Sequence, residues 1–231
     1  YGLGFGGFLT TNGSLFSFTD LDELKKIGLD CINFSIDTFD ESEYLKICKK
    51  NNLKKVLLNL EYAYKIGIGV KVNCVVDNLF SFSRFEALLE IIKDKKIALR
   101  FIELMPLKYS DRNTKMSELI EYVQKNYILN AYDHKLGNGP AHYYTILEFQ
   151  GYIGFIEALH NKFCSECNRV RLSSVGRLKL CLFHMDGVDL KPYLNNLEEL
   201  EKVMREWIFK KPKEHHFEEE HSSTVMNEIG G

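Results

Sequence analysis

Three cysteines in the C-terminal half are spaced so that they could bind one metal centre. Cys164 and Cys167 are separated by two residues in the pattern C-x2-C-x13-C, which Cys181 completes. Two thiolates at this spacing can reach one metal from a tight turn, and a hairpin after Cys167 would bring Cys181 back to them. An iron–sulfur cluster with three cysteines keeps one iron open, whereas His184 would complete a closed Cys3His zinc site. The spacing leaves both alternatives open.

Two arginines follow the second cysteine. Arg169 and Arg171 alternate along a predicted strand, so both guanidinium groups point to the same face. Paired guanidinium groups are suited to bidentate recognition of phosphate. The sequence therefore indicates a phosphate-binding face directly beside the predicted metal site.

The elements expected to position these residues begin with an alternation of strands and helices. Strands are predicted at the start of 8–13 and over 31–36, 70–76 and 98–104, with helical segments such as 53–66 and 82–92 between them. This alternation predicts βαβ units and a parallel sheet, and the small number of strands predicts an incomplete barrel. Polar residues gather where the strands end, which is where ligands bind in parallel α/β folds.

The pattern changes after Met105. A helix is predicted over 114–125 and another over 197–209, and Gly137–Pro140 is typical of a turn. Antiparallel hairpins are predicted within 141–156 and 169–183. We therefore expect an α/β protein with a partial parallel β/α barrel over 1–107, followed by a smaller α+β domain with antiparallel hairpins over 108–231.

Composition excludes several classes of protein. The 231 residues include 16 Phe and 12 Tyr, which is typical of a folded chain. A net charge of −2 argues against a nucleic-acid partner, and no apolar run is long enough to span a membrane. No secretory signal is present, so we expect a cytoplasmic protein with free thiols. A partial sheet would expose unpaired strand edges, which predicts poor stability in isolation.

Several motifs together resemble a known family. In order along the chain, they are Leu9–Gly13, Asn33–Asp37, Val70–Asn73, Arg100–Met105, Phe163–Arg171 and Ile229–Gly231. With these motifs the chain resembles the GTP 3′,8-cyclase family, radical S-adenosylmethionine enzymes that catalyse the first step of molybdenum cofactor biosynthesis. The resemblance covers nearly the whole chain from Phe8 onward, and the cysteine–arginine run with the terminal double glycine is its most specific part.

The resemblance implies roles for individual residues. Cys164, Cys167 and Cys181 would bind the C-terminal [4Fe–4S] cluster of the family, whose open iron faces the guanine. The implied contacts to GTP are Thr10, Lys71, Arg169 and Arg171. Ser35 and Met105 would hold S-adenosylmethionine, and Gly230 and Gly231 would form a tail that reaches into the active site. In the complete enzyme, a deoxyadenosyl radical would abstract hydrogen from the ribose C3′ of GTP, and C3′ would then bond to guanine C8.

The sequence also departs from the family. The family's C-x3-C-x2-C loop, which holds a second [4Fe–4S] cluster and cleaves S-adenosylmethionine, is missing, and Cys31, Cys48 and Cys74 are too widely spaced to replace it. A Gly-Gly-Glu-Pro segment and a further GTP-binding arginine are missing as well. We therefore expect a C-terminal fragment that keeps the substrate-binding half of the site and is inactive alone.

The resemblance further implies partners. GTP is the expected substrate, the accessory protein of cyclic pyranopterin monophosphate synthase acts downstream, and the family forms homodimers. Two alternatives remain: a non-catalytic zinc module formed by the three cysteines and His184, and the auxiliary-cluster domain of another radical enzyme.

Overall fold

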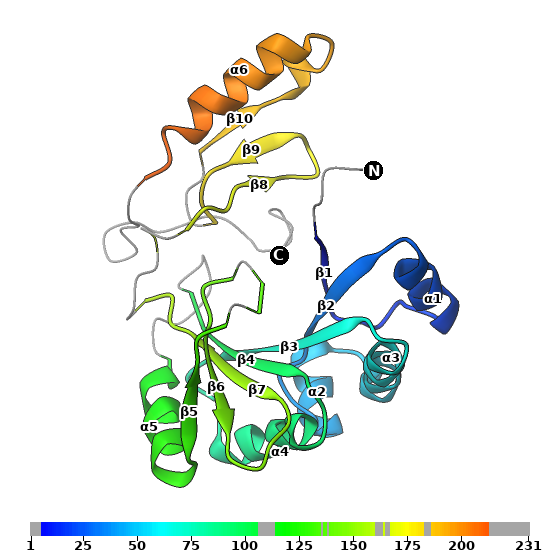
Figure 1. Ribbon diagram of the computed structural model, residues 1–231, viewed down its shortest axis with the longest axis vertical. Coiled ribbons are helices and arrows are strands. Elements are labelled where there is room, and N and C mark those ends of the chain that lie inside the picture. The colour runs from blue at the N-terminus through cyan, green and yellow to red at the C-terminus, as the bar shows by residue number, and fades with distance from the viewer. Residues whose placement is uncertain are drawn as a thin grey trace. The chain divides into compact units, whose positions relative to one another are not determined.

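The computed structural model divides into two compact units (Figure 1). It describes residues 6–105, 114–134, 136–137, 139–159, 164, 167–182 and 186–212. Unit 1 comprises Tyr1–Glu103 and Asn113–Glu157, and unit 2 comprises Leu104–Arg112 and Ala158–Gly231. In the described part of the chain, no helix is both long and apolar enough to cross a membrane.

Unit 1 is built on a seven-stranded sheet in the order β1-β2-β3-β4-β7-β6-β5. Its strands are β1 (Gly7–Thr11), β2 (Leu29–Ser35), β3 (Gly69–Val76), β4 (Ala98–Glu103), β5 (Leu129–Tyr132), β6 (His142–Ile146) and β7 (Tyr152–Ile156). Strands β1, β2, β3, β4 and β7 run parallel, and β6 and β5 are added antiparallel. The mixed α/β architecture predicted from the sequence is confirmed.

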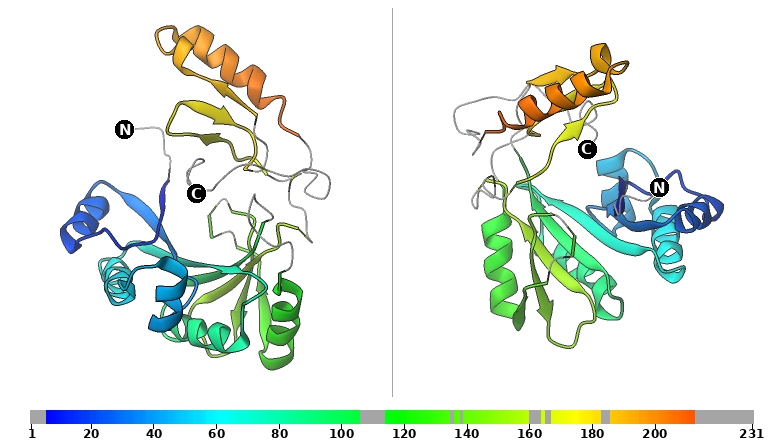
Figure 2. Two further views of the ribbon diagram at one scale, coloured as in Figure 1. Left: turned by 180° about the vertical axis from the view of Figure 1, so that it is seen from behind. Right: turned by 45° about the horizontal axis from the view of Figure 1, so that its top comes forward.

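Five helices lie along one side of this sheet (Figures 1 and 2). They are α1 (Phe18–Lys26), α2 (Glu41–Cys48), α3 (Leu53–Lys65), α4 (Phe82–Lys93) and α5 (Met116–Asn126). Side chains fix where several of them begin: Ser17 forms a capping box with Asp20, and the Asp40 carboxylate accepts a hydrogen bond of 2.8 Å from the Glu43 amide. These caps satisfy amides that have no partner within the helix.

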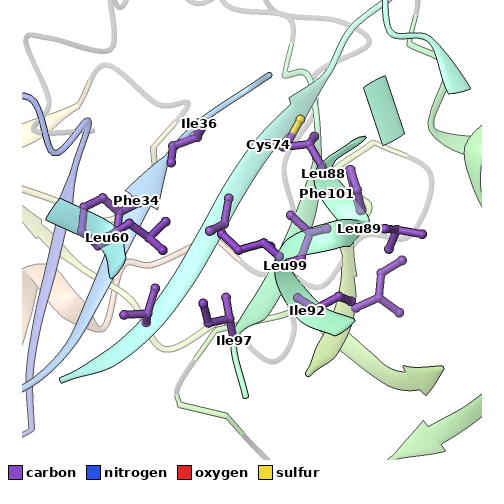
Figure 3. Close-up of a cluster of buried hydrophobic side chains, with 14 of the residues drawn as sticks. Phe34, Ile36, Leu60, Cys74, Leu88, Leu89, Ile92, Ile97, Leu99 and Phe101 are labelled. Carbon is purple, nitrogen blue, oxygen red and sulfur yellow. The ribbon is translucent and has the colours of Figure 1, made fainter. Parts of the chain in front are cut away.

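Alternate residues of the strands face the helices and form the core (Figure 3). Phe34, Leu99 and Phe101 are fully buried, and the Phe101 ring lies 5.3 Å from the Phe85 ring, centroid to centroid. Burying each such side chain contributes about 1.5–3 kcal/mol relative to leaving it exposed. Because side chains alternate across a strand, the residues between these core positions must point to the other side of the sheet.

Strand β7 places the second half of unit 1 in the same sheet as the first half. Ile153 pairs with Leu99 in parallel register, and residues 113–157 belong to unit 1. This differs from the expected division at residue 107, which assigned these strands to the second domain. Gly151 makes the close approach possible, because a Cβ there would lie 2.5 Å from the Ile97 carbonyl oxygen.

Unit 2 contains a three-stranded antiparallel sheet in the order β10-β9-β8. Its elements are β8 (Arg171–Leu172), β9 (Arg177–Lys179), β10 (Gly187–Asp189), a 3-10 helix η2 (Lys191–Tyr193) and α6 (Leu197–Ile208). The predicted hairpin around Val175-Gly176 is present, and Gly176 adopts a φ of +79° at its turn. The strands are shorter than predicted from the sequence.

Candidate functional site

A hydrogen-bonded network of polar side chains crosses the side of the unit 1 sheet opposite the core. The Arg100 guanidinium donates from Nε to Asn73 Oδ1 and from Nη2 to Asn33 Oδ1, each at 2.8 Å. The Asn33 amide in turn donates to Thr10 Oγ1 at 3.1 Å. The network therefore connects β1, β2, β3 and β4, and it fixes the orientation of the predicted site residue Thr10.

Tyr143 extends this network from β6. Burial raises the pKa of Tyr143, while the charge and hydrogen bond of Arg100 lower it, and the net direction is upward. Tyr143 is therefore a neutral phenol at physiological pH. Gly154 opposite it on β7 leaves room for the ring, because a Cβ at 154 would lie 2.8 Å from Tyr143 Cε1.

Lys71 lies on the same face of the sheet and is half-buried. Its ammonium donates a hydrogen bond to the carbonyl of Leu136 and lies 5.4 Å from the centroid of the Phe8 ring. Burial lowers the pKa of Lys71, and the nearby charge of Arg100 lowers it further. Among the described residues, neither Lys71 nor Arg100 has a carboxylate within salt-bridge distance. Two partly or fully buried cations with neutral partners favour binding of an anion here.

The structure places the two residues expected to hold S-adenosylmethionine as follows. Ser35 is exposed at the last position of β2, where its Cα pairs with that of Asn73. It therefore lies on the same face of the sheet as Thr10 and Lys71. Met105 follows β4 by two residues and is grouped with unit 2.

A buried charge cluster fixes the chain just after Ser35. Asp37 Oδ1 accepts a hydrogen bond of 2.8 Å from the Val75 amide, which holds the end of β2 against β3. Burial raises the pKa of Asp37, and it outweighs the opposing effects of the Val75 hydrogen bond and the Arg84 charge. Arg84 itself is ion-paired with Glu43.

In unit 2, Cys164 and Cys167 form the tight turn expected from their spacing. The Cys167 amide donates to the Cys164 carbonyl at 3.1 Å. Burial raises the pKa of Cys167, but hydrogen bonds from Arg169 and the charges of Arg169 and Lys211 outweigh it, so the pKa is lowered overall. A lowered pKa favours the thiolate, which is the form that binds metals.

The two predicted phosphate-binding arginines lie close to these sulfurs. Arg171 on β8 is half-buried, and both burial and the charge of Arg169 lower its pKa, whereas the thiolates of Cys181 and Cys167 raise it. Arg169 is exposed. Unit 2 therefore brings both arginines into electrostatic range of the metal-ligand candidates.

Lys211, which was not predicted as a site residue, connects the two arms of the hairpin that follows Cys167. Its ammonium donates to the Arg169 carbonyl at 2.8 Å and also to the Leu180 carbonyl. These carbonyls lie on the two arms of the hairpin that carry the cysteines. This role could not be predicted from the sequence, because Lys211 lies in a charged segment without periodicity.

The donor chemistry of unit 2 fits a metal bound through thiolates. Three thiols are present, one has a lowered pKa, and positive charge surrounds them. In the described ranges, however, no three metal-ligating side chains are close enough to hold one ion. His184, Gly230 and Gly231 lie outside the described residues.

Comparisons with known proteins agree with this fold. The family model "Radical SAM superfamily" matches residues 4–92, and the model "Molybdenum Cofactor Synthesis C" matches residues 97–217. The crystal structure of Streptococcus suis SuiB bound to S-adenosylmethionine aligns with a TM-score of 0.55 at 12% identity, over 89% of this chain and 48% of that one. The fold and the matching model thus define a protein of the radical S-adenosylmethionine superfamily, whose members use this cofactor with a [4Fe–4S] cluster.

Curated relatives narrow this class. The GTP 3′,8-cyclase of Clostridium perfringens is 35% identical over 96% of this chain and 72% of its own length. The enzyme of Syntrophomonas wolfei gives the same values, and that of Rhizobium etli is 36% identical over 90% of this chain and 62% of its own length. The chain belongs to the GTP 3′,8-cyclase family, which serves molybdenum cofactor biosynthesis through radical chemistry.

Proposed function

We propose that this chain binds GTP and takes part in its conversion to (8S)-3′,8-cyclo-7,8-dihydroguanosine 5′-triphosphate. The observation that carries this proposal is the pair of cations on the polar face of the unit 1 sheet. Lys71 and Arg100 are held there by a carbonyl and by neutral amides, so their charges remain available to an anionic ligand. A nucleoside triphosphate is such an anion. We propose GTP as the nucleotide because the relatives are named GTP 3′,8-cyclases.

Four residues are proposed to contact the nucleotide. Lys71 in unit 1 and Arg169 and Arg171 in unit 2 provide positive charge for the phosphates. The Thr10 hydroxyl provides a polar contact, and its orientation is set by Asn33. Arg100 adds positive charge to this face of the sheet and also holds Asn33 and Asn73 in place.

The proposed cofactor contacts follow from the family. Ser35 and Met105 would bind S-adenosylmethionine, and Cys164, Cys167 and Cys181 would hold a [4Fe–4S] cluster. When bound, S-adenosylmethionine and its cluster supply the radical that takes hydrogen from the ribose C3′. The protein's own part is to hold the ribose and guanine in position, and Gly230 and Gly231 are proposed to approach the reacting atoms closely.

We assign the radical-generating step to no residue of this chain. The 231 residues contain no C-x3-C-x2-C motif. We therefore propose that the chain by itself produces no 5′-deoxyadenosine when supplied with S-adenosylmethionine and a reductant. Robust production would contradict this assignment.

The family also leads us to propose the cellular setting. The product would pass in the cytoplasm to the accessory protein of cyclic pyranopterin monophosphate synthase, and the chain would form a homodimer. Sedimentation of the reconstituted protein tests the second point.

Binding of GTP and of guanosine to the anaerobically reconstituted protein tests the central proposal. GTP should bind more tightly than guanosine, and Lys71→Ala should weaken GTP binding by about tenfold or more, because a charged hydrogen bond contributes about 1.5–3 kcal/mol. Lys25→Ala is the matched control, since the Lys25 ammonium also donates to a backbone carbonyl, that of Gly67, but on an exposed surface. Equal affinities for GTP and guanosine would contradict phosphate recognition.

Metal analysis tests the cluster. The reconstituted protein should be brown, should bleach with reductant and should lose iron when Cys181 is replaced by Ser. A colourless protein with stoichiometric zinc would contradict the iron–sulfur assignment.

A further inference from the structure

The loop between β5 and β6 reaches the cations of the polar sheet face. It joins the end of β5 at Tyr132 to the start of β6 at His142, and it includes Leu136, Gly137 and Gly139. The Leu136 carbonyl accepts a hydrogen bond from Lys71, and a Cβ at Gly137 would lie 3.0 Å from Lys71 Nζ. The loop therefore meets the proposed phosphate-binding lysine at two consecutive residues.

The close approach at position 137 depends on glycine. Gly137 adopts a φ of +107°, a conformation that other residues rarely adopt, and a Cβ there would crowd the Lys71 ammonium. Gly139 comes near the second cation, since a Cβ there would lie 3.9 Å from Arg100 Nη1.

A carbonyl partner affects the lysine differently from a carboxylate. An ammonium has three N–H donors, and the Leu136 carbonyl takes one of them. The Phe8 ring flanks the ammonium at 5.4 Å. Because the carbonyl is neutral, the contact fixes where the ammonium lies without neutralising its charge. The arrangement orients a cation and leaves it able to bind an anion.

We propose that Leu136 and Gly137 are positioning residues of the nucleotide site. The Leu136 carbonyl holds the Lys71 ammonium in place for a phosphate, and Gly137 provides the space that this contact requires. This inference rests on the role of Lys71 in GTP binding proposed above. If the loop instead blocked Lys71 until GTP displaced it, a substitution that disturbs the loop would tighten GTP binding.

Gly137→Ala tests the inference, with Gly67→Ala as its matched control. Gly67 also has a left-handed φ of +79° and lies 3.6 Å, at its Cβ position, from the ammonium of Lys25. Both substitutions place a side chain on a left-handed backbone beside a lysine, but Gly67 lies at the surface turn after α3 and its Cβ position is not crowded. Gly137→Ala should weaken GTP binding by about tenfold, and Gly67→Ala should leave it within about twofold. Tighter GTP binding by Gly137→Ala would overturn the inference.

A second readout needs no nucleotide. Acetylation of lysines in the intact reconstituted protein, followed by mass spectrometry, reports how accessible each amine is. Gly137→Ala should increase the acetylation rate of Lys71, and Gly67→Ala should leave that of Lys71 unchanged. Unchanged acetylation of Lys71 together with unchanged GTP affinity in Gly137→Ala would overturn the inference and leave the proposed function standing.

A double-mutant cycle separates this effect from a general loss of structure. If Gly137 acts through Lys71, Gly137→Ala should have no further effect on GTP affinity once Lys71 is replaced by Ala. An equal loss in both backgrounds would overturn the inference. An unchanged GTP affinity for Lys71→Ala alone would overturn the proposed function, and the inference with it.

A second variant keeps the test decisive if Gly137→Ala does not fold. Lys71→Arg retains the positive charge, but its longer planar group does not occupy the place of the ammonium beside the Leu136 carbonyl. It should weaken GTP binding at least about fivefold. Wild-type affinity for this variant would overturn the inference.

Discussion

The two units are stabilised in different ways. Unit 1 has a continuous apolar core in which residues such as Phe34, Leu60 and Phe101 are fully buried. The described part of unit 2 buries few residues, chiefly Leu178, Leu180 and Leu190, and helix α6 has none that is fully buried. A small sheet with so little core gains stability from polar contacts and from whatever it binds. The comparison indicates that unit 1 is stabilised mainly by its apolar core, and it predicts that unit 2 gains stability from the proposed cluster.

The units also hold their cations differently. In unit 1, Lys71 and Arg100 are fixed by a carbonyl and by amides within a rigid sheet. In unit 2, Arg169 and Arg171 lie near the thiols of Cys167 and Cys181 on a short hairpin. Lys211 donates hydrogen bonds to backbone carbonyls of this hairpin. Only the first arrangement is ordered by extensive apolar packing behind it.

The largest expected effect comes from breaking the core of unit 1. Phe101→Ala should lower the free energy of unfolding by about 3–5 kcal/mol, because it leaves a cavity among Phe80, Phe85 and Phe155. Urea denaturation measures this change. Leu172→Ala in unit 2, where the side chain is 63% exposed, should change stability by about 0.5 kcal/mol or less. A loss below about 1 kcal/mol for Phe101→Ala would show that unit 1 is not held by this core.

Removal of the cluster should affect unit 2 alone. A ligand present at a hundred times its Kd stabilises the state that binds it by about 2.7 kcal/mol. Hydrogen exchange in the iron-reconstituted protein should therefore be slower at Arg177–Lys179 than in the metal-free protein, while exchange in β3 and β4 should stay the same. Equal protection of unit 2 in both forms would contradict the comparison.

Replacement of Lys211, which hydrogen-bonds to both arms of the unit 2 hairpin, should have a smaller effect. Lys211→Met removes hydrogen bonds to the Arg169 and Leu180 carbonyls and should destabilise unit 2 by about 1 kcal/mol. Exchange at β8 and β9 should become faster, and less iron should be retained. Lys202→Met, at an exposed position of α6, is the control and should resemble the wild type. A Lys211→Met protein indistinguishable from this control would show that the hairpin is held by other contacts.

The smallest expected effect concerns the pH dependence of unit 1. Burial raises the pKa of Asp37, so its contribution to stability is greatest below the ordinary carboxyl pKa and is lost as pH rises through the raised value. Asp37→Asn keeps an acceptor for the Val75 amide but does not titrate, so its free energy of unfolding should fall less than that of the wild type over this range. Denaturation at several pH values measures the difference.

Asp37→Ala serves as the comparison for that experiment. It also removes the titrating group, but it leaves the Val75 amide without its partner and should cost about 1 kcal/mol at every pH. A wild-type pH profile for Asp37→Asn would show that Asp37 is ionised in the folded protein without penalty.

Much of unit 1 could be predicted from the sequence, because its signals are local. The alternation of core residues such as Phe34 and Leu99, together with the cap at Asp40, places strands and helices within a few residues. The pairing of β7 with β4 could not be predicted this way. The hairpin pattern over 141–156 shows that two strands pair with each other, but it does not show which third strand they join.

Less of the candidate site than of the unit 1 fold could be predicted from the sequence. Thr10 and Lys71 were expected to contact GTP because the family resemblance implies it, and the register places them on the same face of the sheet. Arg100 and Asn33 were not recognised as a network, since polar residues within strands are as typical of an exposed face. Leu136 could not be found at all, because it acts through a backbone carbonyl that any residue possesses.

The most direct test of the account measures GTP affinity after removing one cation from each unit. In the anaerobically reconstituted protein, Lys71→Ala in unit 1 and Arg171→Ala in unit 2 should each weaken GTP binding by about tenfold or more, with guanosine binding much less affected. Lys25→Ala and Lys202→Ala should bind GTP as the wild type does. If either Lys71→Ala or Arg171→Ala bound GTP with wild-type affinity, the claim that both units supply charge to the nucleotide would be wrong.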